Sequence, residues 1–270
     1  MSNKDTASNS DTEFTAQVPE FLERPNGQHI AYIKTEGDND LPGIVFLGGY
    51  MSDMTGSKAT ALEEFAKSSK QNFVRFDYMG HGQSSGKFTD GTIGQWTEDA
   101  IAVIDELTTG PQILVGSSMG GWISLLLARA MPERIAGLVT IAAAPDFTED
   151  SMWAGFTDAQ KAELAEKGQV ALPSDYGEPY IITKRLIEEG RNTLVLRDPL
   201  PLPFPTRFLQ GTADADVDTS VALRLLDHAK GSDMRLTLVD GADHRFSDSA
   251  CLALIEQSVE DVLKAGEGAA

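Results

Sequence analysis

The sequence contains a single cysteine, few basic residues and no long hydrophobic run. Cys251 has no partner for an internal disulfide, which fits a reducing compartment, and its place in an expected helix indicates a buried packing thiol. Lysine and arginine number 22 against 41 aspartates and glutamates, and the net charge of −19 disfavours nucleic acid and anionic membrane surfaces as partners. No apolar run reaches the roughly 18 residues of a membrane-spanning helix, so no integral membrane segment is expected.

The beginning of the chain lacks the features of a targeting segment. Residues 1–11 are polar, with one lysine and no apolar core, so they do not resemble a secretory signal, and no mitochondrial targeting pattern is visible. We therefore expect residues 1–20 to form a disordered tail and the protein to be cytoplasmic. The chain has an ordinary hydrophobic content of 41%, and residues 21–270 fit one domain with an insertion.

Short apolar runs alternate with helical patterns through most of the chain. Strands are predicted at 28–35, 43–47, 72–77, 112–115, 135–143, 206–210 and 234–239. Helices are predicted at 57–70, 93–107, 122–130, 220–229 and 249–264. This alternation predicts an α/β fold with a mostly parallel central sheet covered by helices on both faces. The first strand alternates apolar and polar residues and is expected at a half-exposed edge of the sheet.

The alternation is interrupted at about residues 146–200. Helical patches are predicted at 158–167 and 181–189, without a strand–helix repeat, so we expect a helical cap insertion over the sheet edge. Four cap residues are candidates for an apolar wall beside an acyl chain, or for simple packing: Phe147, Met152, Trp153 and Phe156. Four basic residues are candidates for contact with an acidic leaving group, although a solvated helix face is the simpler interpretation: Lys184, Arg185, Arg191 and Arg197.

A Gly-x-Ser-x-Gly motif lies between an expected strand and an expected helix. Gly116, Ser118 and Gly120 occupy its fixed positions. In this context the serine sits on a strained turn that exposes its hydroxyl above the sheet, and the small glycines let the strand and the helix approach each other. Ser118 is therefore the candidate nucleophile.

A serine nucleophile needs a base, and the base needs an acid to orient it. In an open parallel sheet both should lie at the carboxyl ends of later strands. Asp214 follows the strand predicted to end at Gln210, and His244 follows the strand predicted to end at Val239. The order Ser118, Asp214, His244 is that of α/β-hydrolases.

Other residues compete for these roles. Asp216, Asp218 and Asp146 also follow strand ends and are alternatives for the acid. Of the other histidines, His81 lies in a Gly-rich loop, where a structural role is favoured over one in the pocket. His29 and His228 are expected to face solvent.

Neither a metal nor a cofactor is predicted. The alternating Asp214, Asp216 and Asp218 suggest a calcium loop, but Thr219 and Leu225 stand where an EF-hand needs glycine and glutamate. The Gly-rich loops match neither a P-loop nor a dinucleotide-binding motif.

Backbone N–H groups are expected to stabilise the oxyanion of a tetrahedral intermediate. One should come from the residue after the nucleophile, Met119, and one from the loop after an earlier strand, where Tyr50 follows Gly48 and Gly49.

Longer stretches carry a family resemblance. They are residues 49–58, 75–78, 110–122 and 243–245, together with Pro173, Ser174 and Tyr176 in the expected cap. On these the chain resembles the α/β-hydrolase superfamily, and within it the α/β-hydrolase-domain group of palmitoyl-protein thioesterases and acyl-glucuronide esterases. The chain departs from that group at Gly48, where proline is expected, and after Val217, where a proline is missing.

The resemblance implies that Ser118, Asp214 and His244 form a catalytic triad. It also implies hydrolysis of a small-molecule or acylated-protein ester or thioester through an acyl-enzyme. Two alternatives stay open: a carboxylesterase acting on small lipid or short-chain esters, and a non-catalytic ligand receptor on the same fold.

Overall fold

The computed structural model describes residues 17–172 and 179–267. The expected tail lies outside the described residues up to residue 16, and Glu20, assigned to that tail, is already the first residue of a strand. Pro173, Ser174 and Tyr176 of the expected cap also lie outside the described residues.

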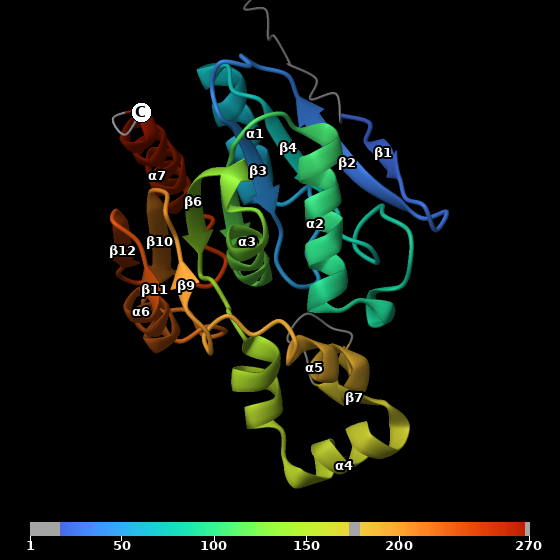
Figure 1. The fold of residues 1–270 in the computed structure, drawn as a ribbon. Coiled ribbons are helices and arrows are strands. Elements are labelled where there is room, and N and C mark those ends of the chain that lie inside the picture. The colour runs from blue at the N-terminus through green and yellow to red at the C-terminus, as the bar shows by residue number, and fades with distance from the viewer. Residues whose placement is uncertain (1–16, 173–178, 268–270) are drawn as a thin grey trace, which may run out of the picture.

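One large sheet organises the described part of the chain (Figure 1). Its strands follow the order β1-β2-β4-β3-β5-β6-β10-β12, and the neighbours from β4 to β12 are parallel. Their bounds are Glu20–Glu23 (β1), His29–Thr35 (β2), Gly43–Leu47 (β3), Phe73–Phe76 (β4), Gln112–Ser117 (β5), Ile135–Ile141 (β6), Thr206–Gly211 (β10) and Met234–Val239 (β12). The predicted α/β class with a mostly parallel sheet is confirmed.

The edge predicted for the first strand is wrong. β2 pairs with β4 on one side and with the short antiparallel β1 on the other, so β1 is the edge strand. A tight turn at Asn26 and Gly27, the latter with φ 76°, joins β1 to β2. The chain before Gln28 thus contributes a strand that its mixed composition did not indicate.

Helices cover both faces of the sheet because the parallel strands are apolar on both sides. On β3, Ile44 and Phe46 pack toward α1 and α7, whereas Val45 and Leu47 face the cluster of α2 and α3. The helix bounds are Ser57–Ser69 (α1), Ile93–Leu107 (α2), Met119–Ala130 (α3), Thr219–His228 (α6) and Ser249–Glu267 (α7). Among the described residues, none of these helices combines the length and hydropathy that a membrane crossing requires.

The segment between β6 and β10 extends away from the sheet at the lower end of Figure 1. It holds a π-helix at Thr148–Trp153, α4 at Asp158–Lys167, and α5 at Lys184–Gly190. Two short strands, β7 (Gln169–Leu172) and β8 (Tyr180–Thr183), pair antiparallel between them. The predicted helix at 181–189 is therefore wrong at its start, where the β-branched run Ile181-Ile182-Thr183 forms β8 and Thr183 then caps α5.

Two strands of two residues each were also not predicted from the sequence. β9 (Leu200–Pro201) lies in the Pro-rich segment that closes the insertion and pairs with β11 (Ala229–Lys230), which follows α6. The Leu202 N–H extends this pairing by donating to the Lys230 carbonyl at 2.8 Å. This contact holds the end of the insertion against the C-terminus of α6.

Candidate active site

Ser118 lies at the sharp turn between β5 and α3. Its backbone has φ 53° and ψ −114°, a conformation that non-glycine residues rarely adopt. A Cβ on Gly120 would lie 2.1 Å from the Leu47 carbonyl oxygen, and one on Gly116 would lie 2.4 Å from the Gly120 carbonyl oxygen. Only glycine fits these two positions, which confirms the strand–turn–helix geometry predicted from the motif.

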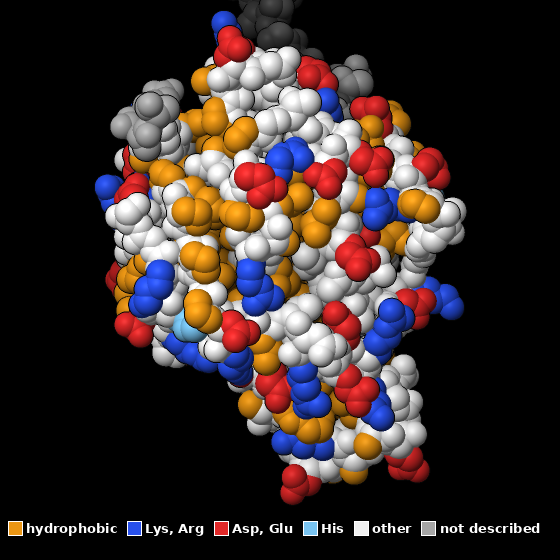
Figure 2. Space-filling view, in the orientation of Figure 1, with side chains coloured by type: hydrophobic (Ala, Val, Ile, Leu, Met, Phe, Trp, Pro, Cys, Tyr) orange, Lys and Arg blue, Asp and Glu red, His pale blue; other side chains and the backbone are white. Residues whose placement is uncertain are grey.

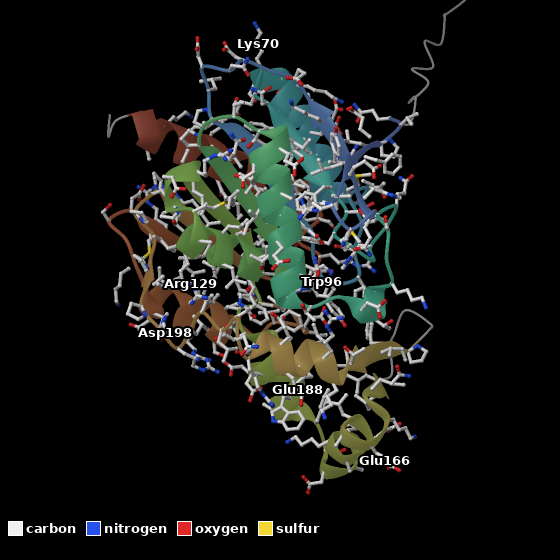
Figure 3. The ribbon with its side chains drawn as sticks, turned by 45° about the vertical axis from the view of Figure 1, so that its right-hand side comes forward. Lys70, Trp96, Arg129, Glu166, Glu188 and Asp198 are labelled. Atoms are coloured by element: carbon white, nitrogen blue, oxygen red, sulfur yellow. The ribbon has the colours of Figure 1, made fainter. Side chains whose placement is uncertain are left out.

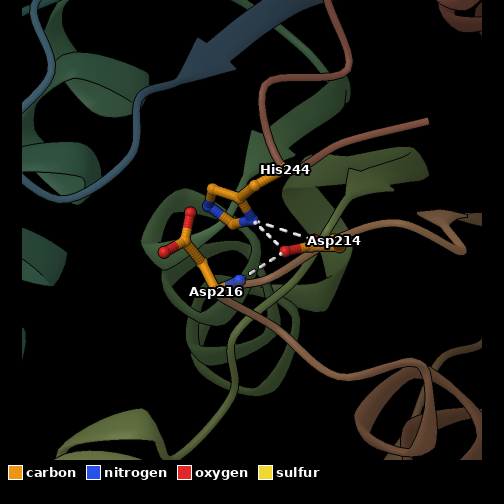
Figure 4. A group of neighbouring side chains, drawn as sticks. All are labelled: Asp214, Asp216 and His244. Carbon is orange, nitrogen blue, oxygen red and sulfur yellow. Dashed lines mark hydrogen bonds and ion pairs between the residues drawn. The ribbon is translucent and has the colours of Figure 1, made fainter. Parts of the chain in front are cut away.

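Three side chains from separate loops form one hydrogen-bonded chain. The imidazole Nε2 of His244 lies 3.1 Å from the Ser118 hydroxyl oxygen. Its Nδ1 lies 2.9 Å from Oδ2 of Asp214, as Figure 4 shows. The carboxylate can only accept, so Nδ1 carries the proton and Nε2 is left to accept from the serine. The turns after β5, β10 and β12 supply one residue each, as the strand-end rule predicts.

Asp214 is held by more than His244. Its side chain is fully buried, and its Oδ1 accepts the backbone N–H groups of Asp216 at 2.9 Å and Val217 at 2.8 Å. Burial alone would raise the pKa of Asp214, but the hydrogen bonds from His244 and Val217 outweigh it and hold that pKa below its usual range. The carboxylate is therefore ionised beside the imidazole at neutral pH.

The alternative acids have other partners. Asp146 is buried and accepts the N–H groups of Val195 at 2.7 Å and Leu196 at 3.0 Å, so it anchors the end of the insertion. Asp218 caps α6 through the Ser220 N–H. Neither bonds to His244 in the described structure.

Asp216 comes closer to the imidazole. Figure 4 shows its exposed carboxylate on the side of the His244 ring away from Asp214. Ligand atoms of Asp214, Asp216 and His244 all lie within 4.8 Å of one another, the spacing of a possible metal site. Both Asp214 oxygens are already engaged by N–H donors, so this donor set fits an acid–base pair better than a metal centre.

The loop after β3 borders the nucleophile. A Cβ on Gly49 would lie 3.5 Å from the Ser118 Cβ, so the Gly49–Tyr50 peptide passes directly beside the serine. Ser52 fixes this turn, since its N–H and hydroxyl donate to the Gly49 carbonyl at 3.2 and 2.7 Å. The Tyr50 and Met119 N–H groups, expected as oxyanion donors, thus belong to the two turns that flank the Ser118 hydroxyl.

Aromatic side chains connect this loop to the insertion. The Tyr50 ring makes edge contacts with Phe88 at 4.8 Å and Phe147 at 5.8 Å, and Phe147 in turn contacts Trp122 at 5.4 Å. Burial raises the pKa of the Tyr50 hydroxyl, which has no hydrogen-bond partner among the described residues. Of the four cap residues expected as an apolar wall, Phe147 is the one that meets the candidate oxyanion loop.

The other cap aromatics face charged side chains. Trp153 contacts Phe156 at 6.3 Å, and Lys161 and Arg191 lie over its ring at 5.0 and 4.9 Å. Acidic and basic side chains are interspersed over this part of the surface (Figure 2).

Ion pairs engage three of the four cap cations. Lys184 pairs with Glu188, Arg191 with Glu149, and Arg197 with both Asp146 and Asp150. Arg185 lines an open surface hollow beside α5 together with Glu188 and Glu189. This pairing fits the simpler interpretation, a charged helix face.

His81 is structural by its surroundings. It is 4% exposed, and its ring lies within 5.1 Å of Phe88 and Trp96. Burial lowers the pKa of His81 to about 4, so it is neutral at pH 7. Trp96 stands at the end of α2 that faces the insertion, where α5 carries Glu188 (Figure 3). His29 and His228, which were both expected to face solvent, are half-buried, and His228 Nε2 lies 2.8 Å from the Asp198 carbonyl oxygen.

Two residues beside Ser118 and Asp214 were not predicted from the sequence to belong to the site. Ser52 orients the Gly49 carbonyl, and Gln210, fully buried at the end of β10, donates to Asp214 at 2.9 Å. The only sequence signal for either is its position one or a few residues from a predicted strand end.

Comparison with known proteins agrees with this geometry. The chain matches the model of the family described as serine aminopeptidase, S33, over residues 43–199. It is 38% identical to the rat protein named palmitoyl-protein thioesterase ABHD10, mitochondrial, over 90% of this chain and 82% of the relative.

Two solved structures are similar as well. A hydrolase from Agrobacterium vitis has TM-score 0.87 and 38% identity, covering 92% of this chain and 100% of its own. Mouse α/β-hydrolase domain-containing protein 10 has TM-score 0.84 and 35% identity, and the match covers 92% of this chain and 99% of the mouse chain.

The expected cytoplasmic location is contradicted by these relatives. The rat, bovine and human proteins of this name are all designated mitochondrial. The expectation rested on the composition of residues 1–11 and on the single cysteine, which is compatible with more than one reducing compartment.

Proposed function

The chain belongs to the serine aminopeptidase S33 family of α/β-hydrolases, and from this membership we propose that it is a serine hydrolase of acyl thioesters and activated acyl esters. The observation that carries the proposal is the 3.1 Å contact between His244 Nε2 and a Ser118 hydroxyl held on a strained turn, with an ionised Asp214 behind the imidazole. This arrangement supports nucleophilic catalysis by the serine.

In the proposed reaction, Ser118 Oγ attacks the acyl carbonyl carbon while His244 Nε2 accepts the hydroxyl proton. Asp214 stabilises the imidazolium that forms, and the N–H groups of Tyr50 and Met119 donate to the oxyanion. The imidazolium then protonates the leaving group, which leaves with the bonding electrons of its scissile bond. Water, deprotonated by His244, hydrolyses the acyl-enzyme in the second half of the cycle, and no cofactor is needed.

The substrate class is inferred from the relatives. The rat relative is named a palmitoyl-protein thioesterase, so we propose a long-chain acyl thioester on a protein or a small thiol as the preferred substrate. Thiolates are good leaving groups, so these three side chains with two backbone donors are sufficient for their release.

The test compares matched substrates with one acyl chain. Purified protein and Ser118→Ala are assayed on octanoyl and palmitoyl thioesters and on the corresponding oxygen esters, with the released fatty acid measured by chromatography. We expect thioester turnover to dominate and to fall by at least about 10⁴-fold in the variant. Turnover of short oxygen esters alone would assign the protein to the carboxylesterases.

A fluorophosphonate probe tests the nucleophile independently of substrate choice. We expect stoichiometric labelling of Ser118 in the wild type and none in Ser118→Ala. If the probe does not label a folded wild-type protein that also hydrolyses none of the esters, the protein is a ligand receptor on this fold.

A further inference from the structure

Gln210 occupies an unusual position for an uncharged amide. It is fully buried at the end of β10, one residue before the loop that carries Asp214. Its Nε2 lies 2.9 Å from Asp214 Oδ2, 3.0 Å from the Val217 carbonyl oxygen and 3.2 Å from the Gly211 carbonyl oxygen. One amide group therefore contacts the start, the middle and the end of the loop from 211 to 217.

The orientation of this amide is fixed by chemistry. Its nitrogen faces three oxygens that can only accept, so the reversed amide would place Oε1 against all of them. On the other side of the group, Oε1 is buried and has no hydrogen-bond partner among the described residues. An unpaired buried carbonyl is unfavourable, so the contacts that hold the side chain are those at its nitrogen.

We propose that Gln210 is a positioning residue for the acid of the triad, which sets the direction and the charge density of the Asp214 carboxylate facing His244. The inference rests on the proposed function of Ser118, Asp214 and His244. Oδ1 accepts the backbone N–H groups of its own loop, and Gln210 contacts Oδ2 alone. The imidazole Nδ1 lies between the two oxygens, 2.9 Å from Oδ2 and 3.1 Å from Oδ1, so Gln210 acts on the nearer of its two acceptors.

Removing the amide has a specific electrostatic consequence. Without Gln210, Oδ2 keeps only His244 as a donor, so more of its negative charge acts on the imidazole and holds the protonated, inactive form more strongly. Asp216, on the same loop as Asp214, is a second carboxylate near the ring, and the Lys58 ammonium of α1 donates to the Arg245 carbonyl, one residue after His244. Both stay in place when Gln210 is substituted, so a change in the pH profile reports on the amide.

The experiment uses Gln210→Met, which keeps the side-chain length and removes the donor. Octanoyl thioester hydrolysis is followed from pH 5 to 10 by chromatography of the released acid. We expect kcat/KM to fall about 10- to 100-fold, mostly through kcat, and the acidic limb of the profile to move to higher pH. Loss of folded protein alone would lower the active fraction, measured with the fluorophosphonate, without moving that limb.

Gln112 provides a matched control. It is also a buried glutamine on a central strand whose Nε2 contacts backbone carbonyls, those of Thr109, Gly110 and Pro111, at the opposite end of the sheet. We expect Gln112→Met to lower stability and to leave both kcat/KM per labelled site and the pH profile unchanged.

Gln210→Glu gives a second, isosteric readout. A protonated glutamic acid donates to Asp214 as the amide does, whereas an ionised one repels it. We expect this variant to keep activity near neutral pH and to lose it on the alkaline side, in a falling limb that the wild type lacks.

The results distinguish a failure of the role inferred for Gln210 from a failure of the proposed function. If the wild type is labelled and active, and both Gln210 variants keep its kcat and its pH profile, Gln210 only packs the loop and the inference is overturned. If the wild type is neither labelled at Ser118 nor active, the proposed function fails and the inference with it.

Discussion

Ser52 fixes the orientation of the peptide group between Gly49 and Tyr50. Its hydroxyl and its N–H both donate to the Gly49 carbonyl, at 2.7 and 3.2 Å. That carbonyl and the Tyr50 N–H are the two ends of one planar trans peptide, so fixing the oxygen fixes the direction of the hydrogen. Gly49 lies against Ser118, so the direction fixed is that of a proposed oxyanion donor.

Ser52→Ala should therefore slow the chemical step without unfolding the protein. Loss of a whole oxyanion donor costs about 10²- to 10³-fold in kcat, and here the donor stays but is held by one bond less, so we expect about a 10-fold fall in kcat with KM little changed. Steady-state kinetics on the octanoyl thioester measure this.

Ser68→Ala is the control for this substitution, because the Ser68 hydroxyl also donates to a backbone carbonyl, that of Phe65, but on the exposed face of α1. Equal kcat values for Ser52→Ala, Ser68→Ala and the wild type would show that the turn holds its peptide without the hydroxyl.

The meeting of Ser118, Asp214 and His244 in one hydrogen-bonded chain could be predicted from the sequence, whereas the contacts of Ser52 and Gln210 beside them could not. Ser118, Asp214 and His244 each follow a strand that is recognisable from its run of apolar residues. Parallel strands then bring their carboxyl ends to the same edge of the sheet. Ser52 acts through the four-residue turn 49–52, and Gln210 through a side chain buried next to Asp214. Such contacts depend on loop geometry that no periodicity encodes.

At the scale of elements, a buried ion pair joins α1 to β4. Arg75 and Glu63 are 6% and 3% exposed, and the guanidinium contacts the Glu63 carboxylate at 2.7 and 2.9 Å. A third contact, 2.6 Å to the Met54 carbonyl, ties the pair to the segment before α1. The second carboxylate oxygen of Glu63 lies 3.1 Å from the Lys67 ammonium, so both buried charges have several partners.

Arg75→Met should destabilise the protein, because it takes the guanidinium away from the buried Glu63 carboxylate, which then keeps Lys67 of α1, 3.1 Å away, as a charged partner. We expect a loss of up to about 3–5 kcal/mol in the free energy of unfolding, measured by urea titration. The double variant Arg75→Met with Glu63→Leu removes both charges and should recover most of that loss.

An exposed pair calibrates this prediction. Lys264 and Glu260 on α7 lie 3.0 Å apart in solvent, and Lys264→Met should change the free energy of unfolding by less than about 1 kcal/mol. A small loss in Arg75→Met, comparable to this control, would mean that water enters and solvates Glu63.

The central elements could be predicted better than the insertion, and burial explains the difference. β3 and β5 are buried along their whole lengths, so their apolar runs follow directly from the packing of helices on both faces. β7 and β8 form a small antiparallel pair with mixed exposure, where Ile181 and Ile182 satisfy both a helical and a strand pattern. Contacts with the rest of the fold then determine whether these residues form a strand or a helix, and the same holds for β1 at the sheet edge.

At the scale of the whole molecule, charge and burial oppose each other at Asp99. This α2 residue is 1% exposed and accepts the Met79 N–H at 2.9 Å through Oδ2, while its Oδ1 has no hydrogen-bond partner among the described residues. Burial, only partly offset by that N–H, raises the pKa of Asp99 from 3.8 to about 6. Folding therefore favours the protonated acid.

The sign of the pH dependence follows from this shift. Well below pH 4 Asp99 is protonated in both the folded and the unfolded chain, so its contribution to stability is fully present. As the pH rises from 4 through 6, the unfolded chain releases the proton first and the folded protein loses about 3 kcal/mol relative to low pH. Asp99→Asn removes this titration and keeps an acceptor for Met79, so it should be more stable than wild type above pH 7.

The variant isolates Asp99 from the rest of a very acidic chain. With a net charge of −19, acidification also relieves general repulsion, but wild type and variant share that effect, so only the difference between their urea midpoints from pH 4.5 to 8 reports on Asp99. That difference should grow as the pH rises, because only the wild type has to ionise a buried carboxyl group at position 99. Parallel stability curves for wild type and Asp99→Asn would mean that Asp99 is ionised in the folded protein at every pH tested, with water solvating its free oxygen.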